Sequence, residues 1–420
     1  MMTTDTEPSP ARLVGKCPVT HTASFGVADP VLFSDGDYRA TWEHLRGLDR
    51  LSWQQVDARR GFWSVVTYAD ADRVLRDHET FTSQRGTMLD TLGTQDPAGG
   101  RQIPVTDPPR HTGMRARLQK ALTPKSVEAE HDSIRRLVRE LFAPLGDGGP
   151  FDFAQAMLML PVAVAGVAMD LPREDWPRLC HLLNASVAAH DPDYLDTDDA
   201  VATVDGAHRE LFAYFQDIYR ERVRKPETDL ISVLLSTQVD GRPMAPGEVM
   251  SNCYSVLLGA SVTTPHSPNY VMSEHIGDGL LEEWAADITV TPSAVEEALR
   301  LASPVSYFMR HATRDVQVHD TLVKAGDPVV IWFGSANRDE DAFPNPSQFR
   351  LRRKPNRHLA FGMGPHYCVG HTLARATLKI LFQELLTTYT GFEPAGTPVR
   401  MRSTFVSGYK HLPVTARRIG

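Results

Sequence analysis

The stretch Arg357–Arg375, with the sequence RHLAFGMGPHYCVGHTLAR, organises the rest of the chain. Glycines surround Cys368, and a helical pattern begins shortly after it. Just ahead of a helix, backbone N–H groups and the helix dipole favour the thiolate form of a cysteine. Gly362, Gly364 and Gly370 permit unusual backbone angles and let a flat ligand approach the main chain. The stretch therefore indicates a thiolate held against a flat, iron-bearing macrocycle.

The composition is that of a soluble globular protein. The chain has 420 residues, 42% of them hydrophobic and 23% charged, which suffices for a large core. A formal net charge of -8 disfavours general attraction to nucleic acid or anionic lipid. The polar start and the short apolar run at 156–169, broken by Pro161, predict neither a signal peptide nor a membrane span. Four scattered cysteines without zinc-site spacing predict reduced thiols. We expect a cytoplasmic monomer with no nucleic-acid or membrane partner.

Helical patterns outnumber strand patterns. Strands and helices do not alternate along the chain as they would in a protein with a parallel sheet. The sequence therefore predicts a mainly α fold with a small β part. Residues 1–35 are expected to form a flexible N-terminal arm, and residues 36–420 a single domain. Short strands are expected at 51–56, 62–67, 316–318, 328–332 and 412–416.

A long helix is predicted over residues 248–273, and its middle is unusual. Pro265 and Pro268 lack N–H donors, so two carbonyls one turn earlier would lose their helical partners. Free carbonyls and hydroxyls in an apolar helix are costly. The segment is either a helix boundary or a ligand-facing groove, and the small residues beside Thr263 and Thr264 suit the groove.

Two charged pairs lie at helical spacing. His111 and Arg115 lie one turn apart near a helix start, and Glu297 and Arg300 can pair along another helix. Such pairs are commonly solvated surface features. The alternative for His111 and Arg115 is a pair of cationic donors aimed at an anionic ligand group.

In their order and spacing these motifs resemble the cytochrome P-450 haem-thiolate superfamily, along the chain from about Tyr38 onward. The loop from Phe361 to Gly370 matches the family's Phe-Gly-x-Gly-x-His-x-Cys-x-Gly pattern at every fixed place. Residues 297–300 match its Glu-x-x-Arg helix, and residues 107–115 match a helix that binds a haem propionate in soluble bacterial members. The resemblance implies the cytochrome P-450 fold, a helical bundle that encloses haem beside small antiparallel sheets.

The resemblance also implies roles for individual residues. Cys368 is expected to ligate the iron of haem b (iron protoporphyrin IX), and a thiolate ligand favours O–O cleavage. Phe361 is expected to pack against the porphyrin. The remaining cofactor-binding residues would be His111, Arg115, Ala260, Arg310, His366 and Gly370, with charge-assisted bonds to the propionates from His111, Arg115, Arg310 and His366. A buried charge network on the proximal side would consist of Glu297, Arg300 and Arg353.

Substrate-facing segments carry mixed apolar and hydroxyl residues, which suits a medium-sized, largely apolar small molecule with a few polar groups. The long aperiodic loop at 84–103 is expected to be one of them. Thr263 and Thr264 are the expected catalytic residues, with dioxygen as co-substrate. The substrate-facing candidates that the resemblance supplies are Leu257, Val262, Val305, Phe308 and Phe405.

The oxygen-binding helix departs from the family's Ala/Gly-Gly-x-acid-Thr-Thr run, because Val262 replaces the acid that helps relay protons. Valine can neither hold nor transfer a proton. Three functions stay open. The first is a monooxygenase that hydroxylates or epoxidises a compound of bacterial secondary metabolism. The second is an enzyme of oxidative cyclisation, coupling or desaturation, or of peroxide use, although no arginine replaces the acid as in peroxide-using members. The third is a non-catalytic haem sensor, which the full set of substrate-facing segments disfavours.

A basic patch near the proximal side of the haem is also predicted. On a protein of net charge -8 it would steer an acidic ferredoxin or flavodoxin, which with its reductase supplies electrons. The alternative is a set of scattered, solvated side chains. The residues concerned are Arg117, Lys120, Arg350, Arg352, Lys354 and Arg357.

Overall fold

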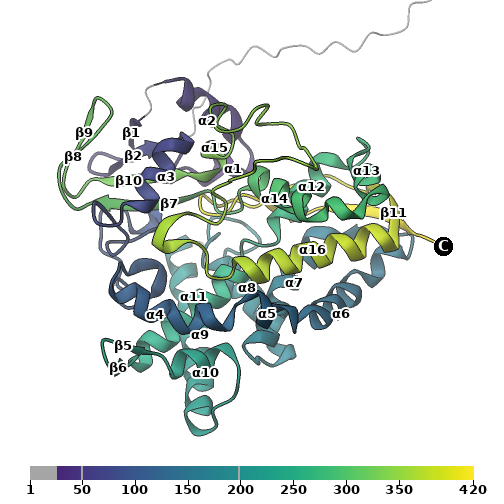
Figure 1. Ribbon diagram of the computed structural model, residues 1–420, viewed down its shortest axis with the longest axis horizontal. Coiled ribbons are helices and arrows are strands. Elements are labelled where there is room, and N and C mark those ends of the chain that lie inside the picture. Colours follow the sequence, from purple (N-terminus) through teal and green to yellow (C-terminus); the bar gives the residue numbers. More distant parts are fainter. Residues whose placement is uncertain (1–25, 49–50, 197–198) are drawn as a thin grey trace, which may run out of the picture.

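The computed structural model describes residues 26–48, 51–196 and 199–420. Helices dominate it and the sheets are small (Figure 1), which confirms the predicted fold class. The helices are α1 (Pro30–Ser34), α2 (Tyr38–Gly47), α3 (Tyr68–Arg76), α4 (Arg110–Ala121), α5 (Pro124–Glu128), α6 (His131–Phe142), α7 (Phe153–Ala168), α8 (Trp176–Ala185), α9 (Ala200–Arg224), α10 (Leu230–Leu235), α11 (Pro246–Ser261), α12 (His266–His275), α13 (Leu280–Ala286), α14 (Thr291–Ala302), α15 (Phe333–Ala336) and α16 (His371–Thr388). The strands are β1 (Leu51–Gln55), β2 (Gly61–Val65), β3 (Phe81–Thr82), β4 (Phe151–Asp152), β5 (Gln238–Val239), β6 (Arg242–Pro243), β7 (Tyr307–Ala312), β8 (Val316–Val318), β9 (Thr321–Val323), β10 (Pro328–Trp332), β11 (Tyr389–Pro394), β12 (Val399–Arg400), β13 (Tyr409–His411) and β14 (Pro413–Arg418).

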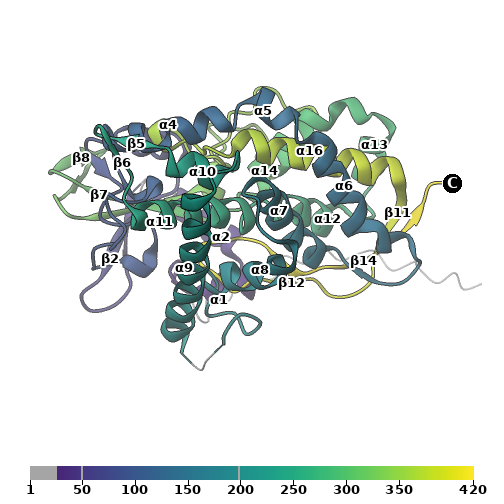
Figure 2. The same ribbon diagram turned by 90° about the horizontal axis from the view of Figure 1, so that it is seen from below.

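Helix α7 lies at the centre of the helical part. Its sequence, FAQAMLMLPVAVAGVA, is apolar on nearly every side, so no wide face of it can be left in water. It packs against α6, α8, α11 and α12, and Figure 2 shows it among several of these helices. The apolar run at 156–169 is therefore a core helix. No helix in the described part of the chain is both long and apolar enough to cross a membrane.

Helix α9 packs differently, through a single stripe. Its buried residues recur every three or four positions, as an amphipathic helix requires. They are Thr203, Ala207, Leu211, Phe215, Ile218 and Arg222.

The larger sheet has the strand order β1-β2-β10-β7-β3 and lies at one end of the molecule (Figure 1). β1 pairs antiparallel with β2, whereas β10 runs parallel to β2 and antiparallel to β7. Trp332 of β10 pairs with Tyr307 of β7, and both side chains are fully buried. The sequence predicts β1, β2 and β10 but misses β7, because Arg310 and His311 interrupt its apolar pattern.

The predicted N-terminal arm, residues 1–35, falls mostly outside the described residues. Residues 26–35 are described and include α1, whose Leu32 and Phe33 are buried in the main core. The ring of Phe33 stacks on Trp332, with centroids 6.1 Å apart. These residues pack with the domain, so its boundary lies before residue 36.

The helix predicted over 248–273 is two helices. α11 ends at Ser261, α12 begins at His266, and a turn occupies residues 262–265. Pro265 is the N-cap residue of α12 and Pro268 lies in its first turn, where backbone N–H groups have no partner within the helix. The prolines therefore mark a helix boundary, one of the two possibilities that the sequence leaves open, and the prediction of one continuous helix over 248–273 is wrong.

Candidate active site

The loop around Cys368 is shaped by close backbone packing. Gly362 and Gly364 have φ angles of 68° and 70°, which residues with a side chain rarely adopt. A Cβ on Gly364 would lie 2.6 Å from the carbonyl oxygen of Leu75 in α3. The N–H of Cys368 donates to the carbonyl of Phe361 at 2.9 Å. The closed loop fixes Cys368 directly ahead of the N-terminus of α16.

Several groups around Cys368 favour a thiolate. Burial raises the pKa of the thiol. The backbone N–H groups of Gly370 and His371, and the charges of Arg115 and Arg375, oppose that rise. N–H donors and cations stabilise the charged form of a thiol, and a metal ion bound to the sulfur would deprotonate it outright.

The four residues predicted to bind propionates come together from α4, β7 and the Cys368 loop. The rings of His111 and His366 lie 4.4 Å apart, centroid to centroid. Arg115 donates to two carbonyls of the loop, each at 2.8 Å, and so ties α4 to it. Arg310 is 3% exposed and donates to the carbonyl of the residue before it. Burial, with the nearby charge of Arg310, lowers the pKa of His366.

This cluster fits the two carboxylates of a haem. The Nε2 atom of His111 is buried and has no hydrogen-bond partner among the described residues. Burial lowers the pKa of His111 to about 3 and that of Arg310 to about 10. Asp107 is a nearby carboxylate; burial acts to raise its pKa, but hydrogen bonds from His366 and Thr82 lower it to about 2. Two further carboxylates would satisfy the buried donors, so the residues present suit haem.

Glu297 is the centre of a fully buried charge network. Its carboxylate accepts two hydrogen bonds from Arg300 and one from Arg353, all at 2.8 Å. The side chain of Asn356 and the backbone N–H of Arg350 donate to it at 3.1 Å. Both guanidinium groups also donate to backbone carbonyls between α15 and the Cys368 loop. The network joins α14 to the segment that leads into this loop.

The C-terminal end of α11 borders open space. Gly259 is exposed, and a Cβ built on it would meet nothing within 4 Å. Thr263 is partly exposed, and its hydroxyl donates to the carbonyl of Gly259 at 2.9 Å. Ala260 and Phe361 are partly buried apolar residues at the edge of the core. A flat ligand would cover such surface.

The predicted substrate-facing residues divide into two groups. Val305 and Phe308 are partly buried, and the ring of Phe308 lies 5.8 Å from that of Phe405, which is 7% exposed. Leu257 and Val262 are 0% exposed and belong to the main hydrophobic core. The structure therefore does not place Leu257 and Val262 beside open space, because their side chains are packed on all sides.

Comparisons with known proteins decide the family. The sequence model of the family Cytochrome P450 matches residues 272–410. Cytochrome P450 NovI of Streptomyces niveus is 31% identical over 395 residues, which cover 92% of this chain and 95% of that protein. The chain belongs to the cytochrome P450 family.

Two further similarities extend over nearly the whole chain. The steroid C26-monooxygenase of Mycobacterium tuberculosis is 28% identical over 409 residues, which cover 93% of this chain and 92% of that protein. The solved structure of P450 OxyD, described as involved in the biosynthesis of vancomycin-type antibiotics, has a TM-score of 0.83 at 30% identity. It covers 93% of this chain and 99% of the OxyD chain.

This cytochrome P450 is an oxidoreductase of the monooxygenase type that uses haem iron and dioxygen. When bound, haem supplies the activation of dioxygen, and a thiolate ligand promotes that chemistry. Cys368 would hold the iron, and His111, Arg115, Arg310 and His366 would hold the propionates. Through these contacts the chain's own residues would hold and orient the cofactor.

A second ion-pair network near Cys368 was not predicted from the sequence. Arg375 donates to the carboxylate of Glu296 at 2.7 and 2.8 Å, and its guanidinium lies 4.3 Å from the centroid of the Phe361 ring. Burial acts to raise the pKa of Glu296, but hydrogen bonds from His358 and Arg375 lower it to about 2. One feature of the sequence could have indicated this network: an arginine lies near a helix N-terminus, where the helix dipole disfavours a cation.

Asp90 is the other residue that sequence reasoning missed, within the loop at 84–103. It is exposed and has no ion-pair partner in the described part of the chain, yet burial raises its pKa. Its neighbour Leu89 donates its N–H to the hydroxyl of the fully buried Tyr307 at 2.9 Å. The bond holds the segment that carries Asp90 against β7. The sequence feature that could have identified Asp90 is an acidic residue in a loop that is expected to contact substrate.

Proposed function

We propose that this cytochrome P450 binds haem b and uses dioxygen to hydroxylate or epoxidise a medium-sized, largely apolar molecule of bacterial secondary metabolism. The geometry of the Cys368 loop carries the proposal, because the closed loop holds Cys368 directly ahead of α16 and Arg115 donates to two carbonyls of the same loop. Val305 and Phe308 suit apolar substrate surface, and Asp90 suits a polar group on it. OxyD is described as involved in antibiotic biosynthesis, and another relative is named a steroid C26-monooxygenase.

Protons must reach the site of oxygen reduction without an acid at position 262. In this proposal Thr263 provides the hydroxyl, which the Gly259 carbonyl orients at 2.9 Å. Thr264 is 8% exposed and provides a second hydroxyl in the same turn. A hydroxyl both donates and accepts hydrogen bonds, so it can pass on a proton that water delivers.

An acidic ferredoxin or flavodoxin, with its reductase, is the electron donor that we propose. Of the basic residues expected near the proximal side, Arg352 is paired with Glu283 and Asp287 at 3.3 and 2.6 Å. The others are exposed and have no carboxylate partner within the described ranges, which leaves their charge available for steering. They are Arg117, Lys120, Arg350, Lys354 and Arg357.

Oxidative cyclisation, coupling or desaturation is the second candidate function. The observation that favours it is Val262, since these outcomes leave no oxygen atom in the product and place different demands on proton delivery. In addition, the turn at 262–265 interrupts the continuous helix that the sequence predicts for this segment.

Two measurements test these proposals. The reduced protein with carbon monoxide should show the red-shifted Soret band of thiolate ligation, and Cys368→Ser should abolish that band. A histidine-type spectrum in the wild-type protein would refute haem-thiolate function. Turnover of a substrate with ferredoxin, reductase and isotopically labelled dioxygen separates the outcomes. Label in the product supports hydroxylation or epoxidation, and an oxidised product without label supports the second candidate.

A further inference from the structure

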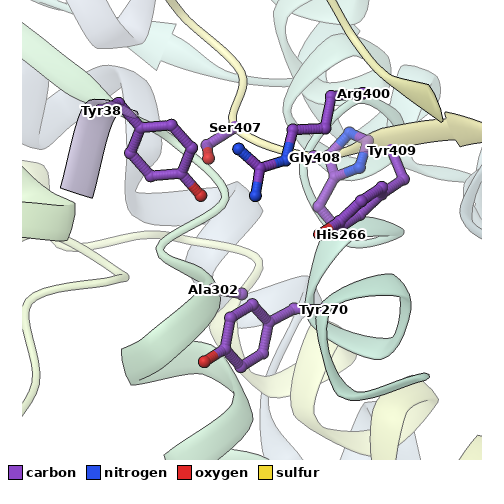
Figure 3. Close-up of a pocket in the computed structure, with 8 residues that line it drawn as sticks. All are labelled: Tyr38, His266, Tyr270, Ala302, Arg400, Ser407, Gly408 and Tyr409. Carbon is purple, nitrogen blue, oxygen red and sulfur yellow. The ribbon is translucent and has the colours of Figure 1, made fainter. Parts of the chain in front are cut away.

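A small polar pocket lies where α2, α12 and α14 meet strands β12 and β13. Its volume is about 10 Å³, enough for one water or a single ion of similar size. Figure 3 shows the guanidinium of Arg400 and the hydroxyls of Tyr38 and Ser407 directed into the same space. Tyr38 and Ser407 are buried, whereas Arg400 is partly exposed. The pocket can therefore exchange its contents with solvent on the side of Arg400.

The charge of Arg400 is not neutralised by any carboxylate in the described part of the chain. Its guanidinium lies 5.1 Å from the ring centroid of Tyr38 and 5.7 Å from that of Tyr409. Burial acts to lower the pKa of Arg400, but these two tyrosines raise it. Aromatic faces attract a cation without cancelling its charge. Arg400 therefore brings a full positive charge to the pocket.

Two further arginines add to this charge. The guanidinium of Arg39 lies 5.8 Å from the ring centroid of Tyr38 and pairs with Glu274 at 2.9 and 3.0 Å, but its Nε is buried and has no hydrogen-bond partner. Arg338 is buried and donates to two backbone carbonyls, at 2.6 and 3.3 Å. No carboxylate among the described residues pairs with Arg338. The region thus has more cationic donors than acceptors of matching charge.

The electrostatic effect is visible at Tyr38. Burial acts to raise the pKa of its hydroxyl, but the three arginines together lower it below the ordinary value. The carboxylate of Glu274 pairs with one of these arginines only, Arg39. A buried charge without a counter-charge is costly. An anion in the pocket would offset part of the excess positive charge.

We propose that this pocket binds a chloride ion, held by the guanidinium of Arg400 and the hydroxyls of Tyr38 and Ser407. N–H and O–H donors are what an anion requires, and hydrogen bonds to an ionised partner are stronger than bonds to a neutral one. The volume favours a monatomic anion over phosphate or a free carboxylate. The ion would join α2 to the segment between β12 and β13 and so stabilise the folded chain. None of these three residues is assigned to haem, so the inference stands apart from the proposed function.

A bromide soak of crystals of the wild-type haem protein is the direct test, because bromide replaces chloride and scatters anomalously. An anomalous peak is expected in the pocket, in contact with the Arg400 guanidinium and the hydroxyls of Tyr38 and Ser407. A pocket that contains water and gives no anomalous peak would overturn the inference.

The second test is urea denaturation in sodium chloride and in sodium gluconate at equal ionic strength, since gluconate is too large for the pocket. Chloride at ten times its dissociation constant should raise the folding equilibrium constant about 10-fold. Arg400→Gln should abolish this difference. Arg402→Gln is the matched control and should keep it, because Arg402 pairs with Asp35 at 3.0 Å and lies outside the pocket. The same chloride effect in both variants would overturn the site.

A third comparison supplies the anion from the chain itself. Ser407→Asp places a carboxylate in the pocket, and Ser407→Asn places a neutral group of the same size there. The Asp variant should be the more stable of the two in gluconate and should no longer respond to chloride. Equal stability of the two variants would show that the pocket is not positively charged and would overturn the inference.

These outcomes are independent of the proposed function. The carbon monoxide spectrum should be the same in the wild-type protein and in the variants, and loss of the thiolate band in the wild-type protein would refute haem-thiolate function alone. If Arg400→Gln does not fold, the bromide peak and the comparison of Ser407→Asp with Ser407→Asn decide the question.

Discussion

The Glu297 network and the segment 261–269 are both polar and buried, but their hydrogen bonding differs. Two arginines, an asparagine and a backbone N–H satisfy the carboxylate of Glu297. In the segment, Ser261, His266, Ser267 and Asn269 keep atoms without protein partners. A fully satisfied network is rigid, whereas partly satisfied groups depend on water. The molecule therefore holds the approach to Cys368 with protein bonds and leaves polar atoms of the segment 261–269 without protein partners.

The largest effect is expected from Glu297→Gln. The substitution keeps the size of the side chain but leaves the buried guanidinium groups of Arg300 and Arg353 without a counter-charge. It should lower the free energy of unfolding by about 3–5 kcal/mol, as breaking buried ion pairs does. Urea denaturation measures this. The control is Glu283→Gln, whose pair with Arg352 is exposed and should contribute less than about 1 kcal/mol. Equal losses in the two variants would show that the network is not the rigid element.

Alanine at two glycines of the Cys368 loop should separate backbone strain from lack of space. Gly362 and Gly364 have nearly the same positive φ, 68° and 70°. A Cβ at Gly362 would meet its nearest neighbour at 3.8 Å, but one at Gly364 would lie 2.6 Å from the Leu75 carbonyl. Both variants should lose about 1–2 kcal/mol to strain, and Gly364→Ala should lose more and weaken haem retention. Thermal unfolding and haem loss measure the difference, and equal effects would contradict the close approach of α3.

The Glu296–Arg375 pair should make stability near Cys368 depend on pH. The pKa of Glu296 is lowered from 4.5 to about 2 in the folded protein. Its contribution is therefore complete above pH 4.5 and is lost as the pH falls toward 2. The difference in unfolding free energy between the wild-type protein and Glu296→Gln should shrink over that range. A difference that stays constant from neutral to acidic pH would show that Glu296 is not held as a carboxylate.

The smallest effect is expected at Ser267, and a matched serine sharpens the comparison. Ser64 is fully buried and its hydroxyl accepts a hydrogen bond from the indole N–H of Trp332 at 2.6 Å, whereas Ser267 is equally buried and has no protein partner. Ser64→Ala should cost about 1–3 kcal/mol, because it leaves the indole N–H unsatisfied. Ser267→Ala should change the free energy of unfolding by less than about 0.5 kcal/mol. A large loss at Ser267 would reveal a hidden protein partner and weaken the contrast.

The features that the sequence predicts correctly are local ones. The prolines at 265 and 268 indicate the boundary that the structure shows between α11 and α12, because their chemical constraint acts within one turn, but the apolar pattern that runs past them led to the wrong prediction of one helix. The contact of Glu297 with Arg300 follows from helical spacing. The contact with Arg353 follows only from the family resemblance, because no local rule joins residues so far apart in the chain.

The features that the sequence misses depend on how elements are oriented. The resemblance gives Leu257 as a substrate-facing candidate, but helical spacing does not show which neighbour a side chain faces, and the structure places Leu257 in the core. The pairing of Glu296 with Arg375 depends on the relative rotation of α14 and α16. Asp90 lies in a loop without periodicity, so no sequence pattern predicts its surroundings. The lack of hydrogen-bond partners at the ring nitrogens of His266 can be seen only in the packed structure.

Helices α7 and α9 also differ in the substitutions that each of them tolerates. Because α9 buries one residue in every three or four, most of its positions can drift in character while the stripe is kept. Helix α7 has no wide polar side, so hydrophobic exchanges of similar volume are the changes it tolerates along nearly its whole length. In relatives that act on other substrates, the residue types along α9 are therefore expected to vary with the helical period of about 3.6 residues, whereas α7 should stay apolar along its whole length.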